Sequence, residues 1–135
     1  MTRILVVEDS GSMRAFVRGA LESDEAELAH VEVVEAASGF DALRLLPRGP
    51  YDLVITDINM PDINGLELLR FMRNSHQHQS TPVLLISTQS AERDRERGLQ
   101  LGADGYLTKP FSPESLRREA LRQLTRGHRL AGPHG

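Results

Sequence analysis

The 135-residue sequence predicts a single α/β domain in which a parallel five-stranded sheet is covered by helices on both faces. Three observations predict this fold. Strand-like and helix-like patterns alternate along the chain, as they do in parallel α/β sheets. The strand-like runs are continuously apolar, which is typical of parallel strands buried on both faces. A chain of this length corresponds to one domain and can bury roughly two-thirds of its unfolded surface.

The N-terminal third predicts a strand, a helix and a second strand. Residues 4–7 form the first apolar run. The helix that follows has apolar residues at helical spacing along one face: Met13, Phe16, Val17, Ala20 and Leu21. The acid-rich residues 22–27 are expected to end this helix and lead into a second strand at residues 31–34.

The middle of the chain predicts a second and a third helix on either side of the third strand. Ser38 fits a helix N-cap because Asp41 follows it by three residues. The second helix is expected to end at three helix-breaking residues, Pro47, Gly49 and Pro50. The third strand is expected at residues 53–56 and the third helix at residues 66–73.

The C-terminal part continues the alternation with strands at residues 83–86 and 106–108. Residues 74–81 are polar and are expected to form a loop in which His76 and His78 are solvated, because nothing nearby completes a metal site.

The last two helices differ in how well they can be anchored. The fourth is expected at residues 91–101, but residues 92–97 are all charged, so its apolar face is thin. The fifth has Ser112 as N-cap and Pro113 at its first position. Its apolar face consists of Leu116, Ala120, Leu121 and Leu124.

Five strands and five helices in strict alternation indicate a doubly wound, three-layer α/β/α sandwich of the flavodoxin-like type, with strand order 2-1-3-4-5. We expect one domain over residues 1–126 and a short flexible C-terminal tail over residues 127–135, which contains Gly and Pro. No internal repeat and no second domain are evident.

The composition excludes several classes of protein. There is no cysteine, hence no disulfide framework and no thiolate metal site. No signal peptide and no run of ~20 apolar residues are present, so we expect a cytoplasmic protein without membrane insertion. Residues 91–135 carry nine basic and six acidic residues, but these interleave without aromatic residues, which argues against direct nucleic-acid binding.

Polar residues end four of the strand-like runs. Glu8 and Asp9 follow the first run, Asp57 follows the third, Ser87 the fourth, and Lys109, the only lysine of the chain, the fifth. The carboxyl ends of parallel strands meet at one edge of a sheet, where ligands bind. Strands often end in polar residues simply because they meet solvent. Contact with solvent explains one or two of these polar ends, but the residue types at all four ends together fit a single chemical mechanism.

Three carboxylates at one edge require neutralisation. At ~4 Å and an effective dielectric constant of about 20, each like-charged pair costs on the order of 4 kcal/mol. Either protons or a hard cation must offset this repulsion. Mg²⁺ prefers oxygen ligands, and Glu8, Asp9 and Asp57 supply them without competing sulfur or histidine ligands. The spacing of the acids does not fit an EF-hand calcium loop.

Asp57 stands alone at the end of a central strand, where a carboxylate can act as a nucleophile and accept a phosphoryl group. Lys109 can supply a compact positive charge to that group, and the Ser87 hydroxyl can donate a hydrogen bond to it. Taken singly, each of these residues also fits an ordinary structural role, such as a loop cap, a surface lysine or a satisfied hydroxyl.

Five segments together resemble the receiver domain of two-component response regulators, most closely the single-domain, CheY-like chemotaxis type. The segments are residues 7–10 (VEDS), residues 56–61 (TDINMP), Gly65, residues 85–87 (LIS) and residues 105–111 (GYLTKPF). They occur in the family's order, and the resemblance covers residues 3 to about 126.

The resemblance implies that Asp57 is the phosphoacceptor and that a histidine kinase is the phosphodonor. It also implies Mg²⁺, with Mn²⁺ as an alternative, held by the side chains of Asp9 and Asp57 and by the backbone carbonyl of Asn59. Glu8 would act on the ion through a water molecule.

The resemblance further implies a switch in which Ser87 is the hydroxyl and Tyr106 the aromatic residue. Their movement would change the face made by the fourth helix, fifth strand and fifth helix, to which an output protein binds. The Lys109–Pro110 bond resembles the family's cis peptide. Arg95 and Glu96 depart from the more apolar fourth helix of the chemotaxis type, which leaves the output partner unknown.

We therefore expect a stand-alone signalling switch that catalyses its own phosphorylation and dephosphorylation, acting as a monomer or a phosphorylation-dependent dimer in chemotaxis-like signalling. The alternative is a relay intermediate that passes its phosphoryl group to a histidine phosphotransfer protein. A haloacid-dehalogenase-type phosphatase is disfavoured because position 59 holds Asn rather than a second aspartate. A flavin-binding flavodoxin is disfavoured because the first turn lacks a phosphate-cradling loop.

Overall fold

The computed structural model describes all residues except 24–27, 29, 89–91 and 131–135. Strands and helices alternate along the chain. The strands are β1 (Thr2–Val7), β2 (Val31–Ala36), β3 (Leu53–Asp57), β4 (Val83–Thr88) and β5 (Gly105–Lys109). The helices are α1 (Gly11–Glu22), α2 (Gly39–Leu45), the 3-10 turn η2 (Leu46–Arg48), α3 (Gly65–Arg73), α4 (Glu92–Gln100) and α5 (Pro113–Leu130). Among the described helices, none is long and apolar enough to cross a membrane.

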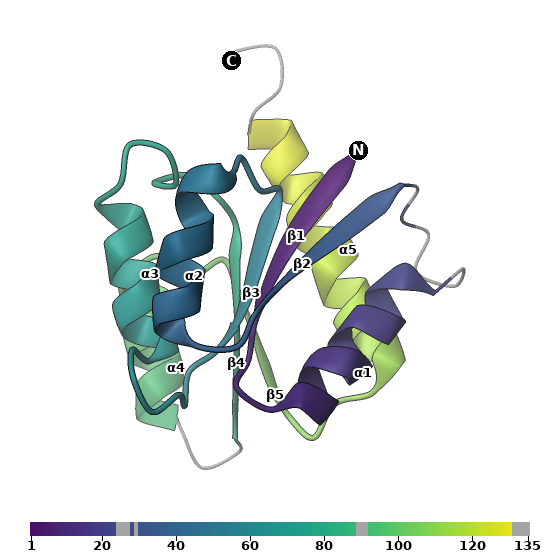
Figure 1. The fold of residues 1–135 in the computed structure, drawn as a ribbon, viewed down its shortest axis with the longest axis horizontal. Helices are drawn as coiled ribbons and strands as arrows, with labels where there is room; N and C mark the ends of the chain where they lie inside the picture. The colour runs from purple at the N-terminus through teal and green to yellow at the C-terminus, as the bar shows by residue number, and fades with distance from the viewer. Residues whose placement is uncertain (24–27, 29, 89–91, 131–135) are drawn as a thin grey trace.

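The five strands are all parallel and lie in the order β2-β1-β3-β4-β5, as the sequence predicts. Figure 1 shows α1 and α5 on one face of this sheet and α2, α3 and α4 on the other. Parallel strands joined by helices place all five carboxyl ends at the same edge. The predicted doubly wound, three-layer sandwich is therefore confirmed.

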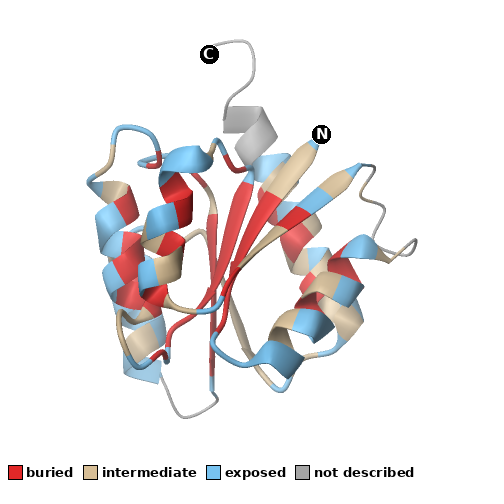
Figure 2. Cartoon of the chain, viewed as in Figure 1, coloured by how far each residue is buried: buried red, intermediate tan, exposed pale blue. Residues whose placement is uncertain are grey.

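Side chains of the central strands alternate between two apolar cores, one on each face of the sheet. Figure 2 shows these strands coloured mainly as buried. Leu5 and Val7 of β1 pack under α2 and α3, whereas Ile4 and Val6 pack under α1 and α5. All four are essentially inaccessible to solvent. Burial on both faces explains why these strands read as continuous apolar runs in the sequence.

Side-chain caps begin α2 and α5 where the sequence predicts them. The Ser38 hydroxyl accepts a hydrogen bond from the Asp41 amide at 3.0 Å, and the Ser112 hydroxyl accepts one from the Ser115 amide at 3.1 Å. Asn64 and Glu67 form a reciprocal capping box at the start of α3. These bonds satisfy amide groups that a helix N-terminus cannot pair internally.

Several element boundaries differ from those expected. β4 extends through Thr88 instead of ending at residue 86, because parallel pairing with β5 continues to Lys109. α5 continues through Leu130, into the segment expected to be a tail. A single glycine inside a helix costs only about 1 kcal/mol relative to alanine, so Gly127 does not end it. Ala91, the expected first residue of the fourth helix, lies outside the described residues.

His78 is buried, so its expected exposure to solvent is wrong, whereas His76 is exposed. The His78 ring packs on Tyr51 with 6.2 Å between ring centroids, and its Nε2 lies 2.7 Å from the Leu46 carbonyl oxygen, to which it donates. The Tyr51 hydroxyl donates to the Leu45 carbonyl at 2.7 Å. A histidine with partners for its ring nitrogens is accommodated in a core.

α4 is attached to the domain mainly at its C-terminal end. Gly98 is its one buried residue, and it allows the helix to approach the Leu85 side chain of β4 closely. The loop after α4 is held by Arg73 of α3, which donates to the Gly102 carbonyl and to the Asp104 carboxylate at 2.9 Å. The thin apolar face predicted for this helix is confirmed.

Candidate phosphoacceptor and metal site

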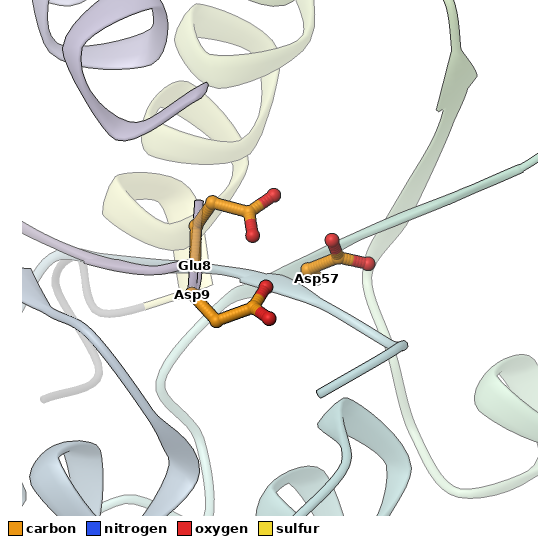
Figure 3. A group of neighbouring side chains, drawn as sticks. All are labelled: Glu8, Asp9 and Asp57. Carbon is orange, nitrogen blue, oxygen red and sulfur yellow. The ribbon is translucent and has the colours of Figure 1, made fainter. Parts of the chain in front are cut away.

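Three carboxylates converge at the carboxyl edge of the sheet. Glu8 and Asp9 follow β1 and Asp57 ends β3, and one oxygen from each lies within 4.8 Å of the others. Figure 3 shows the three side chains directed toward a common region. Glu8 and Asp57 are each only 4% exposed, whereas Asp9 is exposed. β1 and β3 are hydrogen-bonded neighbours in the sheet, which brings residues distant in sequence together.

Lys109 at the end of β5 provides the positive charge of this cluster. Its Nζ donates to Asp57 Oδ2 at 2.7 Å and to Glu8 Oε1 at 3.1 Å. Burial favours the neutral amine, but hydrogen bonds and attraction from Asp57 and Glu8 outweigh it and raise the pKa of Lys109 above its usual range. The ammonium therefore stays charged and bridges two of the three acids.

The Glu8 carboxyl has a strongly altered affinity for protons. Burial, together with hydrogen bonds to Asp9 and Asp57 and repulsion from Asp57, raises the pKa of Glu8 to about 7. The Ser10 amide, which donates to Glu8 Oε2 at 3.0 Å, opposes this rise. Near neutral pH this carboxyl consequently exchanges a proton instead of remaining fully ionised.

Asp57 is held by its own loop as well as by Lys109. The Asn59 amide donates to Asp57 Oδ1 at 3.0 Å, and the Ile58 amide continues the sheet by donating to the Ile86 carbonyl at 2.9 Å. These bonds fix the carboxylate at the end of the strand, and they place Asn59, whose side chain is exposed, beside it.

Ser87 lies one residue beyond the β4 partner of Asp57 and is completely buried. Its hydroxyl has no hydrogen-bond partner among the described residues. A buried hydroxyl without a partner costs about 1–3 kcal/mol. Such a group is a ready donor for a ligand oxygen at the same edge of the sheet.

The donor set fits a hard divalent cation. All three converging groups are carboxylates, and neither sulfur nor imidazole belongs to the cluster in the part of the chain that is described. Mg²⁺ takes oxygen ligands and typically uses one or two carboxylates together with water and phosphate. The mutual repulsion of these acids, which Lys109 offsets in part, gives a dication a favourable place to bind.

Tyr106 of β5 is partly buried beside the core formed with α2 and α3. The guanidinium carbon of Arg95 on α4 lies 5.7 Å from the centroid of its ring, a cation–π contact. The Lys109–Pro110 bond at the end of the same strand is cis, as the resemblance implies. The residue expected as the aromatic switch thus contacts Arg95, one of the two residues of the fourth helix at which the resemblance expects a more apolar pattern.

Sequence reasoning missed Arg14, which supports the acid cluster from α1. Its guanidinium donates to the Glu8 backbone carbonyl at 2.7 Å and pairs with Glu35 of β2 at 3.3 Å. Arg18, one helical turn later, also pairs with Glu35. The sequence does show two arginines four residues apart, which lie on one face of a helix. Their pairing with Glu35 could be predicted only with the register of β1 and β2, which the sequence does not give.

Comparisons with known proteins agree with this geometry. Residues 4–121 match the family model of the response regulator receiver domain. A probable transcriptional regulatory protein of Picosynechococcus sp. is 43% identical over 121 residues; the match covers 84% of this chain and 45% of that protein. The chain thus spans less than half the length of that relative.

Two further matches cover most of this chain and most of the matched protein. A chemotaxis protein CheY homolog of Campylobacter jejuni is 33% identical over 118 residues, which cover 87% of this chain and 88% of that protein. A high-resolution structure of the chemotaxis response regulator CheY4 of Vibrio cholerae superposes with a TM-score of 0.81 at 35% identity, and the match covers 91% of this chain and 98% of that one.

Proposed function

The chain belongs to the response regulator receiver domain family, and on this premise we propose that it is a phosphorylation switch whose phosphoacceptor is Asp57. A histidine kinase of a two-component system donates the phosphoryl group in a Mg²⁺-dependent reaction in the cytoplasm. The observation that carries the proposal is the buried Asp57 carboxylate, bonded to Lys109 and placed within 4.8 Å of the Glu8 and Asp9 carboxylates.

In the proposed transfer, an Asp57 oxygen forms a bond to phosphorus while the bond from phosphorus to the donor imidazole nitrogen breaks. The electron pair of that bond leaves with the imidazole. Asp9, Asp57 and the Asn59 carbonyl would hold the cation, and Glu8 would act on it through water. When bound, Mg²⁺ neutralises charge on the phosphoryl oxygens. Lys109 offsets the remaining negative charge, because its ammonium already contacts the attacking carboxylate.

The phosphorylated state is read out through Ser87 and Tyr106. The unpartnered Ser87 hydroxyl moves to donate a hydrogen bond to a phosphoryl oxygen. This movement leaves space into which the Tyr106 ring can turn. Because Arg95 lies on that ring, its rotation alters the surface formed by α4, β5 and α5. An output protein binding that surface would complete a chemotaxis-like switch. The match to a CheY homolog, which covers 88% of that protein, supports this role.

The test is phosphorylation by acetyl phosphate in Mg²⁺, followed by intact-protein mass spectrometry. We expect one phosphoryl group on the wild type and none on Asp57→Asn. Asp52→Asn is the matched control, since Asp52 lies at the opposite end of β3 and accepts from the Arg3 amide. Labelling of Asp57→Asn at the wild-type level would refute the assignment. Transfer to a histidine phosphotransfer protein that outpaces hydrolysis would identify a relay intermediate instead of a terminal switch.

A further inference from the structure

The Asp62 carboxylate links the loop that follows the phosphoacceptor to the start of α2. Its Oδ1 accepts a hydrogen bond from the Gly39 amide at 3.2 Å, and its Oδ2 accepts one from the Phe40 amide at 2.9 Å. Asp62 belongs to the segment 58–64 between β3 and α3. Within the described residues, it is the one side chain of that segment that hydrogen-bonds to α2.

These two hydrogen bonds satisfy amides at the N-terminus of α2 that have no acceptor within the helix. The first amides of a helix lack internal acceptors and carry partial positive charge. Ser38 satisfies the Asp41 amide, which leaves the Gly39 and Phe40 amides for Asp62. The hydrogen bond from Phe40, followed by those from neighbouring amides, holds the pKa of Asp62 below its usual range despite some desolvation. The carboxylate is therefore ionised and capping at neutral pH.

The packing beside Asp62 leaves little room for the loop to move toward α2. A Cβ atom added at Gly39 would lie 2.4 Å from the Ile63 carbonyl oxygen, so α2 and the loop approach each other as closely as a glycine allows. Asp62 and the Gly39–Ile63 contact thus fix both the distance and the orientation of the loop relative to α2.

The same loop carries a proposed metal ligand. Asn59 lies three residues before Asp62, and its amide already bonds to the Asp57 carboxylate. At the far end, the Gly65 amide donates to the Ile58 carbonyl at 2.9 Å, which closes the segment into a compact loop. Groups that orient a metal ligand without touching the metal commonly control its affinity.

We propose that Asp62 is a positioning residue for the cation site: by capping α2 it holds the 58–64 loop so that the Asn59 carbonyl faces the bound Mg²⁺. This inference rests on the proposed function, because it assumes that Mg²⁺ binds between Asp9, Asp57 and Asn59. Asp62 itself touches neither the ion nor the phosphoryl group, and it acts through the backbone of its loop.

The experiment measures Mg²⁺ affinity by two-dimensional NMR titration of the unphosphorylated protein, far below its melting temperature. Asp62→Ala removes the cap and the charge, whereas Asp62→Asn removes the charge but keeps one acceptor oxygen. We expect about tenfold weaker binding for Asp62→Ala and a smaller loss for Asp62→Asn. Asp52→Ala is the control, because it removes an aspartate that also accepts a backbone amide but lies at the opposite sheet edge.

The amides themselves give an independent readout. In Asp62→Ala we expect hydrogen exchange at Gly39 and Phe40 to accelerate and the Asn59 resonance to shift, while Asp52→Ala leaves both unchanged. Equal Mg²⁺ affinity in Asp62→Ala and wild type would overturn the inference. Equal loss in Asp62→Asn and Asp62→Ala would also overturn it, because charge alone would then explain the effect. Absence of Mg²⁺ binding in the wild type would instead refute the proposed function.

Discussion

Protons and divalent cations compete for the Glu8 carboxyl, since its pKa is raised to about 7 chiefly by burial. In an unfolded chain the same group releases its proton near its ordinary pKa of 4.5. Between pH 4.5 and about 7, the folded, metal-free protein therefore still holds a proton on Glu8 that the unfolded chain has already released. The contribution of this proton to the free energy of unfolding is full below pH 4.5 and is lost as the pH rises through about 7.

Mg²⁺ affinity should show the opposite pH dependence, because the ion needs the ionised acid. Between pH 6 and pH 8 we expect the apparent affinity to rise by up to about tenfold as Glu8 loses its proton. Isothermal titration calorimetry at several pH values measures this change. In Glu8→Gln, which cannot ionise, affinity should be nearly independent of pH over the same range; an unchanged slope would exclude Glu8 as the titrating group.

Replacing Lys109 by arginine should impair switching although the charge is retained. The ammonium contacts Asp57 and Glu8 from one atom, and a planar guanidinium cannot reproduce this compact geometry. We expect the amide shifts that beryllofluoride and Mg²⁺ induce in β5 and α4 to shrink severalfold in Lys109→Arg. A response equal to that of wild type would remove Lys109 from the switch.

Ser87→Ala should separate stability from signalling. The substitution removes a buried hydroxyl that has no partner, so the free energy of unfolding of the unphosphorylated protein should stay unchanged or rise by about 1 kcal/mol. The beryllofluoride-induced change at Tyr106 should be lost, because no donor remains to follow the phosphoryl group. Chemical denaturation and NMR measure the two effects. A destabilised Ser87→Ala protein with a normal response would contradict both expectations.

The regular elements were largely predictable from sequence, because burial and capping leave local signals. Ser38 and Ser112 were readable as N-caps from the residues around them, and both caps are present. The end of α5 could not be predicted, because Gly127 indicates a helix end in the sequence whereas the helix continues through it. His78 was misjudged for a related reason: its neighbours in sequence are polar, whereas the residues that bury it come from the segment after α2.

On α4, Arg95 should hold the Tyr106 ring in its present position. Exposed cation–π contacts contribute about 0.5–1 kcal/mol, enough to shift a two-state ring equilibrium severalfold. We expect Arg95→Ala to move the Tyr106 ring resonances of the unphosphorylated protein toward their beryllofluoride-bound positions. Arg93→Ala, an exposed arginine on the same helix, should leave them in place. Identical spectra for both variants would show that the contact has no influence on the ring.

For the domain as a whole, Mg²⁺ should act as a stabilising ligand. A ligand that binds only the folded state at a hundred times its dissociation constant adds about 2.7 kcal/mol to the free energy of unfolding. At pH 8 we expect the melting temperature to rise by several degrees, as measured by differential scanning calorimetry. Asp9→Asn combined with Asp57→Asn should abolish the rise. An equal rise in that double variant would place the ion elsewhere.

The site was predictable to the extent that it lies at strand ends. Glu8, Asp57 and Lys109 each follow an apolar run, and the rule that parallel strands end at one edge brings them together. Arg14 and Asp62 were not predictable, because each acts through a contact between elements far apart in the chain. Such contacts depend on strand register and helix placement, which no local pattern in a single sequence specifies.

The surroundings of Tyr51 have a practical consequence. The chain contains two tyrosines and no tryptophan, and Tyr51 is sequestered at the opposite end of β3 from Asp57. Replacing it with phenylalanine would cost the hydrogen bond to Leu45 but would leave Tyr106 as the sole tyrosine and hence the dominant intrinsic fluorophore. Ultraviolet emission from an otherwise unlabelled protein would then report, in real time, how the output face responds to each phosphodonor.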